Sequence, residues 1–142
     1  MGRKKWISMG ALAFLALLVA ACGAASSTTG DLAKNADGYT DIDVEQLEAL
    51  MAEEAVTLVN VHIPYEGELP ATDLFLPFDQ IVEYQDQLPD KDAPIVLYCR
   101  SGSMSTTAAE DLVALGYTNL YELDGGFNAW QASGNELLDE NR

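Results

Sequence analysis

The chain is poor in cysteine, histidine and basic residues, and these shortages exclude several classes of function. Its 142 residues include two cysteines, one histidine and seven lysines or arginines, against 23 aspartates and glutamates. The net charge of −16 excludes nucleic acid as a partner, because phosphate backbones require a basic surface. Two distant cysteines argue against a thiolate metal cluster and a Cys-x-x-Cys redox site. The sequence also has no glycine-rich phosphate loop, so it predicts neither a metal nor a nucleotide cofactor.

The first 21 residues have the pattern of an export signal. Basic residues at positions 3–5 precede an apolar stretch over 7–21 that is short for a membrane span. This stretch closes on Leu-Val-Ala-Ala-Cys (18–22), which resembles a bacterial lipobox, where the cysteine is lipidated. We therefore expect a lipoprotein signal peptide over 1–21 and a lipidated Cys22, which would hold the protein on the extracytoplasmic side of a bacterial membrane. An uncleaved N-terminal anchor is the alternative, and it predicts the same location.

The rest of the chain divides into a tether and one domain. Small and polar residues over 22–38 show no apolar periodicity and predict a flexible tether. About one hundred residues follow from 39 to 142, enough for a single core. With Cys22 lipidated, Cys99 is the only thiol, so no internal disulfide is possible. An unpaired thiol in an exported domain is a liability unless it has a chemical role.

Apolar runs of β-favouring residues alternate with segments of helical periodicity along the domain. We expect Asp43 and Asp79 to cap helices, with Gln46 completing a capping box, and Gly116 to end a third helix. The alternation predicts an α/β fold with a mostly parallel sheet and helices on both of its sides. The expected strands cover 39–42, 57–62, 74–77, 95–98 and 120–123, and the last two helices are expected from about 104 and 127.

The centre of the domain is a buried strand, a tight loop and a helix over 94–116. Cys99 lies at the carboxyl end of the strand, directly before the helix. Loop amides, the helix dipole and the charge of Arg100 all favour an anion there. Such surroundings lower a thiol pKa from ~8.5 to between ~3.5 and ~7.5. We therefore predict that Cys99 is a thiolate nucleophile; the alternative is a buried structural cysteine.

Residues 99–105 and 123–130 resemble two signatures of the rhodanese-like sulfurtransferases. They read Cys-Arg-Ser-Gly-Ser-Met-Ser and Leu-Asp-Gly-Gly-Phe-Asn-Ala-Trp, and the resemblance extends over about 39–134. It implies a three-layer α/β/α rhodanese fold in which Cys99 accepts a sulfane sulfur, becomes a persulfide and passes the sulfur to a thiol or another nucleophile. The loop amides would hold the donor and the persulfide anion. These amides belong to Arg100, Ser101, Gly102, Ser103, Met104 and Ser105.

Two places depart from the pattern of that family. Asn60-Val61-His62 stands where the family usually has Asp-Val-Arg, and Met104 stands where family loops often have an arginine that holds the anionic donor. Loss of that cation weakens binding by about 1.5–3 kcal/mol where the contact is a charged hydrogen bond. We therefore expect thiosulfate to be a poor donor and a softer persulfide to be a better one. Phosphatase and arsenate reductase chemistry is disfavoured because both need a loop arginine.

His62 is the only histidine, and it should lie at the edge of the sheet where α/β folds bind their ligands. It is a possible auxiliary residue that bonds the acceptor or tunes the thiolate. We favour another interpretation, in which His62 anchors its own loop through a backbone carbonyl or Glu66.

The second signature predicts a turn followed by a short terminal helix. Its Asp-Gly-Gly (124–126) allows positive φ and a close backbone approach. Phe127 and Trp130 are predicted to be core aromatics, and a role for Trp130 as a wall of the site is the weaker interpretation.

A different class of function competes with the enzyme: a non-catalytic docking module, or a sensor of sulfur or redox state. The altered triplet at 60–62 and Met104 favour this class, whereas the retention of Cys99 opposes it, because docking needs no thiol. A thiol that is only oxidised, or joined in mixed disulfides, is a third hypothesis.

Overall fold

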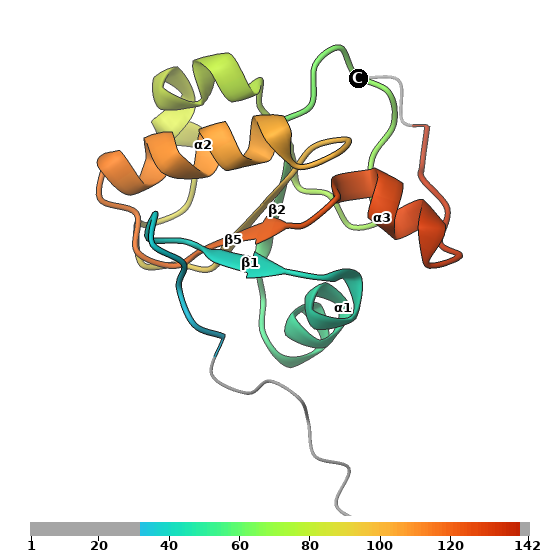
Figure 1. The fold of residues 1–142 in the computed structure, drawn as a ribbon. Coiled ribbons are helices and arrows are strands. Elements are labelled where there is room, and N and C mark those ends of the chain that lie inside the picture. The colour runs from blue at the N-terminus through green and yellow to red at the C-terminus, as the bar shows by residue number, and fades with distance from the viewer. Residues whose placement is uncertain (1–31, 140–142) are drawn as a thin grey trace, which may run out of the picture.

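The computed structural model describes residues 32–139, whose strands form one five-stranded sheet with parallel pairing throughout. The strand order is β1-β5-β4-β2-β3, so β4 lies at the centre (Figure 1). The predicted α/β fold with a mostly parallel sheet is confirmed. The strands are β1 (Thr40–Ile42), β2 (Thr57–Asn60), β3 (Leu74–Phe75), β4 (Ile95–Tyr98) and β5 (Leu120–Leu123). The helices are α1 (Val44–Glu53), the 3₁₀ helix η1 (Phe78–Gln87), α2 (Ser103–Ala114) and α3 (Gly126–Ala132).

Helices cover both faces of the sheet and divide the core into two apolar clusters. The yellow-green η1 and the orange α2 lie on one side of the sheet, and α1 lies on the other (Figure 1). Ile95 and Leu97 of β4 belong to the cluster under η1 and α2, whereas Val96 and Tyr98 belong to the cluster under α1 and α3. Alternate side chains of a strand point to opposite faces, so β4 is buried on both. This is the three-layer arrangement that the sequence predicted.

Helix ends follow the predicted capping chemistry in α1 and α2. Asp43 and Gln46 form the reciprocal capping box, since each side chain accepts the backbone N–H of the other. Gly116 ends α2 with φ +89°, a left-handed conformation that favours glycine. Its amide donates to the carbonyl of Val113 at 2.9 Å, which closes the last turn.

The segment between β3 and β4 differs from the prediction. Asp79 does not cap a helix, because η1 begins one residue earlier, at Phe78, and Pro77 takes the cap position without a side-chain hydrogen bond. The helix is also 3₁₀ rather than α, and Tyr84 inside it departs from helical φ and ψ. β2 ends at Asn60 and β3 at Phe75, two residues before the predicted ends.

The domain's contacts extend on the N-terminal side of the predicted boundary at residue 39. Leu32 packs against the cluster under α1 and α3, and the Lys34 ammonium donates to the carbonyl of Thr118 at 2.5 Å. The predicted signal peptide over 1–21 and the predicted lipidation of Cys22 lie outside the described residues. Among residues 32–139, no helix is both long and apolar enough to cross a membrane.

We predict that Asp43→Ala destabilises the domain by about 1 kcal/mol, because it leaves the Gln46 amide in the first turn of α1 without its acceptor. Asp79→Ala is the matched control, since Asp79 lies at a helix start but makes no cap. It should change the free energy of unfolding by less than about 0.5 kcal/mol. Urea unfolding of the two variants measures the difference, and equal losses would contradict the prediction.

Candidate active site

The register of the sheet brings Cys99 to the carboxyl edge of its central strand. Cys99 directly follows β4, and α2 begins four residues later at Ser103. Leu97 of β4 pairs with Glu122 of β5, and alternation directs the side chains of Leu97, Cys99 and Glu122 toward the face that α2 covers. The residue Cys99 is 1% exposed. Ligand sites of parallel sheets lie at this edge, as the sequence predicted for this thiol.

Two hydrogen-bond donors contact the sulfur of Cys99. The Gly102 amide donates to Sγ at 3.1 Å, and the Ser105 hydroxyl lies 3.4 Å from it. Gly102 has φ +104°, so the turn that aims its amide at the sulfur requires glycine. Of the six predicted loop amides, Gly102 is the one with a hydrogen bond to Sγ among the described residues.

The amides in the first turn of α2 are further hydrogen-bond donors at the end of the helix that follows Cys99. Gly102 is the cap residue of α2, and no side chain caps the helix. The amides of Ser103, Met104 and Ser105 are in the first turn, where no carbonyl of the helix can accept from them. The helix dipole adds positive potential at the same end. A persulfide would place its outer sulfur about 2 Å beyond Sγ, so the charge to be stabilised lies beyond Cys99 itself.

Arg100 has a different environment from the predicted one. Its guanidinium pairs with Glu66 across the site, with Nη1 3.0 and 3.4 Å from the two carboxylate oxygens. The Glu66 carboxylate also accepts from Nε2 of His62 at 2.6 Å. These bonds, that of His62 first, lower the pKa of Glu66. The charge of Arg100 is thus compensated by a carboxylate, which weakens the field it exerts on Cys99.

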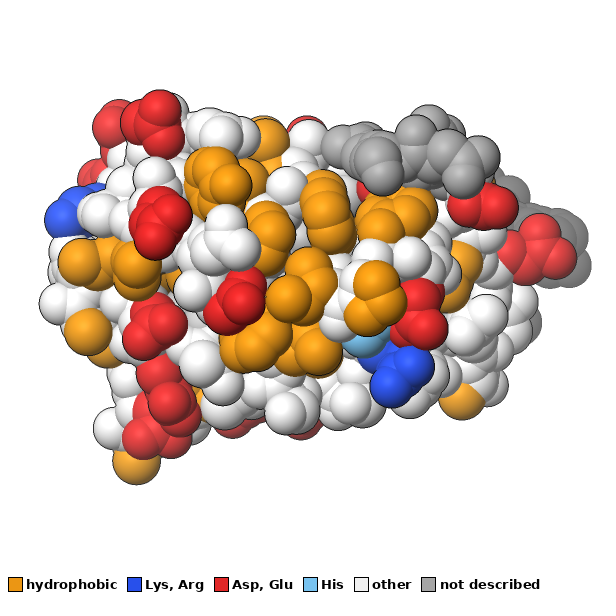
Figure 2. Space-filling view, turned by 90° about the horizontal axis from the view of Figure 1, so that it is seen from above, with side chains coloured by type: hydrophobic (Ala, Val, Ile, Leu, Met, Phe, Trp, Pro, Cys, Tyr) orange, Lys and Arg blue, Asp and Glu red, His pale blue; other side chains and the backbone are white. Residues whose placement is uncertain are grey.

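His62 anchors its loop through Glu66, one of the two partners that the sequence analysis favoured. It is buried, with its ring edge against Phe127 at 5.3 Å between centroids. In Figure 2 the histidine lies beside one basic and one acidic side chain. The structure thus connects the carboxyl ends of β2 and β4 through His62, Glu66 and Arg100.

Met104 contributes apolar surface rather than charge. Its side chain is partly buried and packs against the cluster under η1 and α2, as do Phe78 and Tyr84 of η1. The position where related loops often have a cation is therefore occupied by a thioether in an apolar setting. Met104 therefore supplies no positive charge to bind an anionic sulfur donor.

Sequence reasoning missed one residue of the site, Glu122. It is 2% exposed, and one of its carboxylate oxygens makes a very short hydrogen bond with the Ser105 hydroxyl. The pKa of Glu122 is raised to about 7, first by burial and then by the charges of Asp124 and Asp41, against the opposing effect of the Ser105 hydrogen bond. A glutamate in the middle of an otherwise apolar strand was the signal that could have identified it.

The first turn of α3 lies against the backbone of the Cys99 loop. The amides of Phe127 and Asn128 donate to the carbonyls of Cys99 and Arg100, both at 3.0 Å. Gly126 has φ +51°, and a Cβ there would lie 2.0 Å from the Cys99 carbonyl oxygen. The predicted close approach at the second glycine is thus observed. Phe127 and Trp130 are buried in the core, as predicted.

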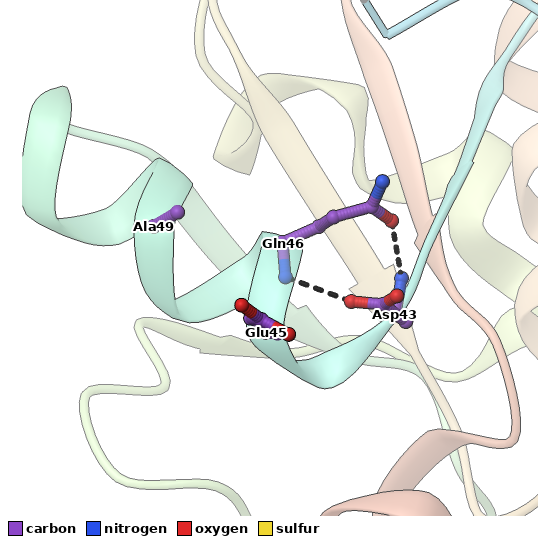
Figure 3. A pocket seen from close by; sticks show the side chains of 4 residues that line it. All are labelled: Asp43, Glu45, Gln46 and Ala49. Atoms are coloured by element: carbon purple, nitrogen blue, oxygen red, sulfur yellow. Dashed lines mark hydrogen bonds between the residues drawn. The ribbon is translucent and has the colours of Figure 1, made fainter. Parts of the chain in front are cut away.

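One further cavity opens at the start of α1, and it does not reach the chemistry of Cys99. Figure 3 shows that Asp43, Glu45, Gln46 and Ala49 line it. Asp43 and Gln46 bond to each other, and the remaining polar residue is a glutamate. The lining holds no nucleophile and no cation, so this cavity is not a candidate for the anion chemistry expected of the loop.

Most of the described domain is similar, in sequence and in structure, to proteins of one family. Residues 43–133 match the model of the rhodanese-like domain. A thiosulfate sulfurtransferase GlpE of Coxiella burnetii is 38% identical over 68 residues, covering 48% of this chain and 63% of that protein, which is under two thirds of its length. A sulfurtransferase of Allochromatium vinosum is 38% identical over 98 residues, covering 66% of this chain and 90% of that protein. A rhodanese-related protein of Thermoplasma volcanium has a similar structure, with a TM-score of 0.62, 25% identity, and coverage of 72% of this chain and 100% of that one.

We predict that Gly126→Ala destabilises the protein by at least about 2 kcal/mol more than Gly134→Ala. Both glycines have positive φ, so both variants carry backbone strain. An added Cβ at Gly126 collides with the backbone of Cys99, whereas at Gly134 nothing lies within 4 Å. Thermal or urea unfolding tests this. Equal decreases in the free energy of unfolding for the two variants would show that the contact between α3 and the loop does not stabilise the protein.

Proposed function

The chain belongs to the rhodanese-like family of sulfurtransferases, and we propose that it carries sulfane sulfur as a persulfide on Cys99. The observation that carries the proposal is the surroundings of the sulfur. Cys99 lies at the carboxyl end of β4, with the Gly102 amide 3.1 Å away and the uncapped first turn of α2 beside it. The fixed dipoles of this amide and of the helix end stabilise a negative charge on the sulfur.

The proposed reaction consists of two successive transfers of one sulfur atom. In the first, the Cys99 thiolate attacks the outer sulfur of the donor, the sulfur–sulfur bond of the donor breaks, and the leaving group departs with its electron pair: sulfite from thiosulfate, or a thiolate from a persulfide. In the second, an acceptor nucleophile attacks the outer sulfur of the Cys99 persulfide and releases the Cys99 thiolate. No external oxidant or reductant is consumed. Splitting one transfer into two is the advantage of a covalent intermediate.

The environment of the loop favours a soft donor over thiosulfate. Arg100 is paired with Glu66, and Met104 packs with apolar residues, so neither presents an uncompensated cation to a dianion. Figure 2 shows hydrophobic side chains across the face formed by η1 and α2, extending to the site of the histidine. A low-molecular-weight or protein persulfide brings less negative charge to the sulfur site than thiosulfate does. A thiol is the corresponding acceptor.

The location is part of the proposal. The basic, apolar and lipobox-like pattern over 1–22 supports export and lipid attachment at Cys22, with the domain outside the cytoplasm on a bacterial membrane. Sulfur delivered there would come from extracytoplasmic donors. The acidic surface opposes contact with anionic lipid head groups, so the lipid at Cys22 would be the attachment.

A second candidate function is a sensor of sulfane sulfur or redox state that does not turn over. The specific observation in its favour is that Cys99 is only 1% exposed, which slows large acceptors more than small donors. In this case Cys99 would load with sulfur, or with oxygen, and release it slowly.

The test of the function is the intact mass of the protein after exposure to thiosulfate or to a small persulfide. We expect Cys22→Ser, whose single thiol is Cys99, to gain the mass of one sulfur atom and to lose it on addition of cyanide or thiol. Cys99→Ser should gain none. Loading without release supports the sensor. Oxygen adducts alone support a redox sensor, and the absence of any adduct would exclude sulfur carriage.

We predict that Met104→Arg raises kcat/KM for thiosulfate by at least about tenfold, since a charged hydrogen bond to the donor is worth about 1.5–3 kcal/mol and each ~1.4 kcal/mol is a factor of ten in rate. Met104→Leu is the matched control, because it keeps an apolar side chain against η1. Rates with a persulfide donor should rise much less than rates with thiosulfate. Equal thiosulfate rates in the native protein and Met104→Arg would show that the missing cation does not set the donor preference.

A further inference from the structure

A buried carboxyl group lies behind the Cys99 loop, and the transfer steps above do not use it. Glu122 of β5 is 2% exposed and contacts the loop through the Ser105 hydroxyl. That hydroxyl also lies 3.4 Å from the sulfur of Cys99. Ser105 is itself fully buried. The three side chains therefore form a continuous chain, carboxyl to hydroxyl to sulfur, from three different elements of the fold.

Ser105 has one hydroxyl proton and three acceptors within reach. These are a carboxylate oxygen of Glu122, the Gly102 carbonyl at 2.9 Å, and the sulfur of Cys99. An ionised Glu122 is the strongest acceptor and takes the proton. A neutral Glu122 instead donates its own proton to the Ser105 oxygen, because a protonated carboxyl has one donor. The hydroxyl proton of Ser105 is then free to point toward the sulfur.

We propose that Glu122 is a positioning residue for the sulfur chemistry of Cys99: in its neutral form it turns the Ser105 hydroxyl toward the sulfur anion, and in its charged form it withdraws that donor. This role rests on the function proposed above. Ionisation of Glu122 would destabilise the sulfur anion in two ways. Ionisation of Glu122 removes a hydrogen bond from the sulfur and also adds a like charge near it, and both disfavour the thiolate and the persulfide anion.

The groups that face Glu122 make this switch operate near neutral pH. Asp41 of β1 and Asp124 after β5 have carboxylate oxygens within 4.8 Å of that of Glu122. Together with burial, which is the larger cause, these two residues raise the pKa of Glu122 to about 7. Ser105 from α2 is the opposing contact, and no lysine or arginine among residues 32–139 pairs with this carboxyl. Cys99 is the remaining titratable group in the chain of contacts.

Coupling of this kind is reciprocal. If ionisation of Glu122 disfavours the anion on Cys99, then an anion on Cys99 must raise the proton affinity of Glu122 by the same factor. Loading Cys99 with anionic sulfur therefore draws a proton to Glu122, and unloading releases it.

The experiment is a pH titration of the thiolate by its ultraviolet absorbance, in a Cys22→Ser background where Cys99 is the only thiol. We expect Glu122→Gln, which is neutral at every pH and still donates to Ser105, to titrate in one step with its midpoint about one pH unit below that of the native site. Ser105→Ala should move the midpoint upward. Asp124→Asn is the control for loss of a nearby charge alone, because Asp124 lies near Glu122 and makes no bond to Ser105. It should move the midpoint much less than Glu122→Gln does.

A double variant tests whether Ser105 carries the effect. Glu122→Gln should shift the midpoint less when Ser105 is already alanine, and the difference is the part transmitted by the hydroxyl. Thermal unfolding of each variant verifies that it is folded at the pH of measurement. An unchanged midpoint in Glu122→Gln, or an equal shift in Asp124→Asn, would overturn the inference.

The titration needs no sulfur donor, so its outcome is separate from the test of the function. A shifted midpoint in a protein that never loads sulfur supports the coupling and refutes the sulfurtransferase. Sulfur loading with an unshifted midpoint supports the sulfurtransferase and refutes the coupling.

Discussion

The Cys99 loop keeps its shape because the first turn of α3 lies on its backbone. Two amides of that turn donate to the carbonyls of Cys99 and Arg100, and Gly126 fits there only because it has no Cβ. From the other side the loop is fixed by β4, which is buried on both faces of the sheet. With its carbonyls held from outside, the loop directs the amide of Gly102 inward to the sulfur. The conformation of the Cys99 loop therefore depends on a contact made by a segment more than twenty residues away in sequence.

Neutral dipoles, rather than cations, provide the local support for an anion in this site. The chain has a net charge of −16, and Arg100, the basic residue next to Cys99, pairs with Glu66. What remains is the Gly102 amide, the Ser105 hydroxyl and the first turn of α2. Dipoles fixed by the fold stabilise a single charge on sulfur but compensate a dianion poorly. The proposed preference for a soft donor and the presence of Met104 are both consistent with this lack of an uncompensated cation.

The sequence predicted the elements whose causes are local and missed the contacts that depend on the sheet. The capping box joins Asp43 and Gln46, which are three positions apart, and two consecutive glycines at 125–126 indicate a positive φ, so both features were predictable. Asp79 failed as a cap because Pro77 started the helix earlier. The contact of Ser105 with Glu122 joins α2 to β5, and it becomes visible only when the parallel register is known. The pairing of Arg100 with Glu66 is long-range in the same way.

The altered triplet at the end of β2 supports its loop by other bonds and leaves the contacts of the Cys99 sulfur intact. Asn60 is buried, accepts the His62 amide at 3.0 Å, and donates to the Gly67 carbonyl at 3.0 Å. A carboxylate at this position would accept the first bond but could not donate the second. His62 then reaches Glu66, which holds Arg100 beside the site. The departures from the family's residues in this triplet therefore change how the loop is tied to the sheet, whereas Gly102 and Ser105 still face the sulfur.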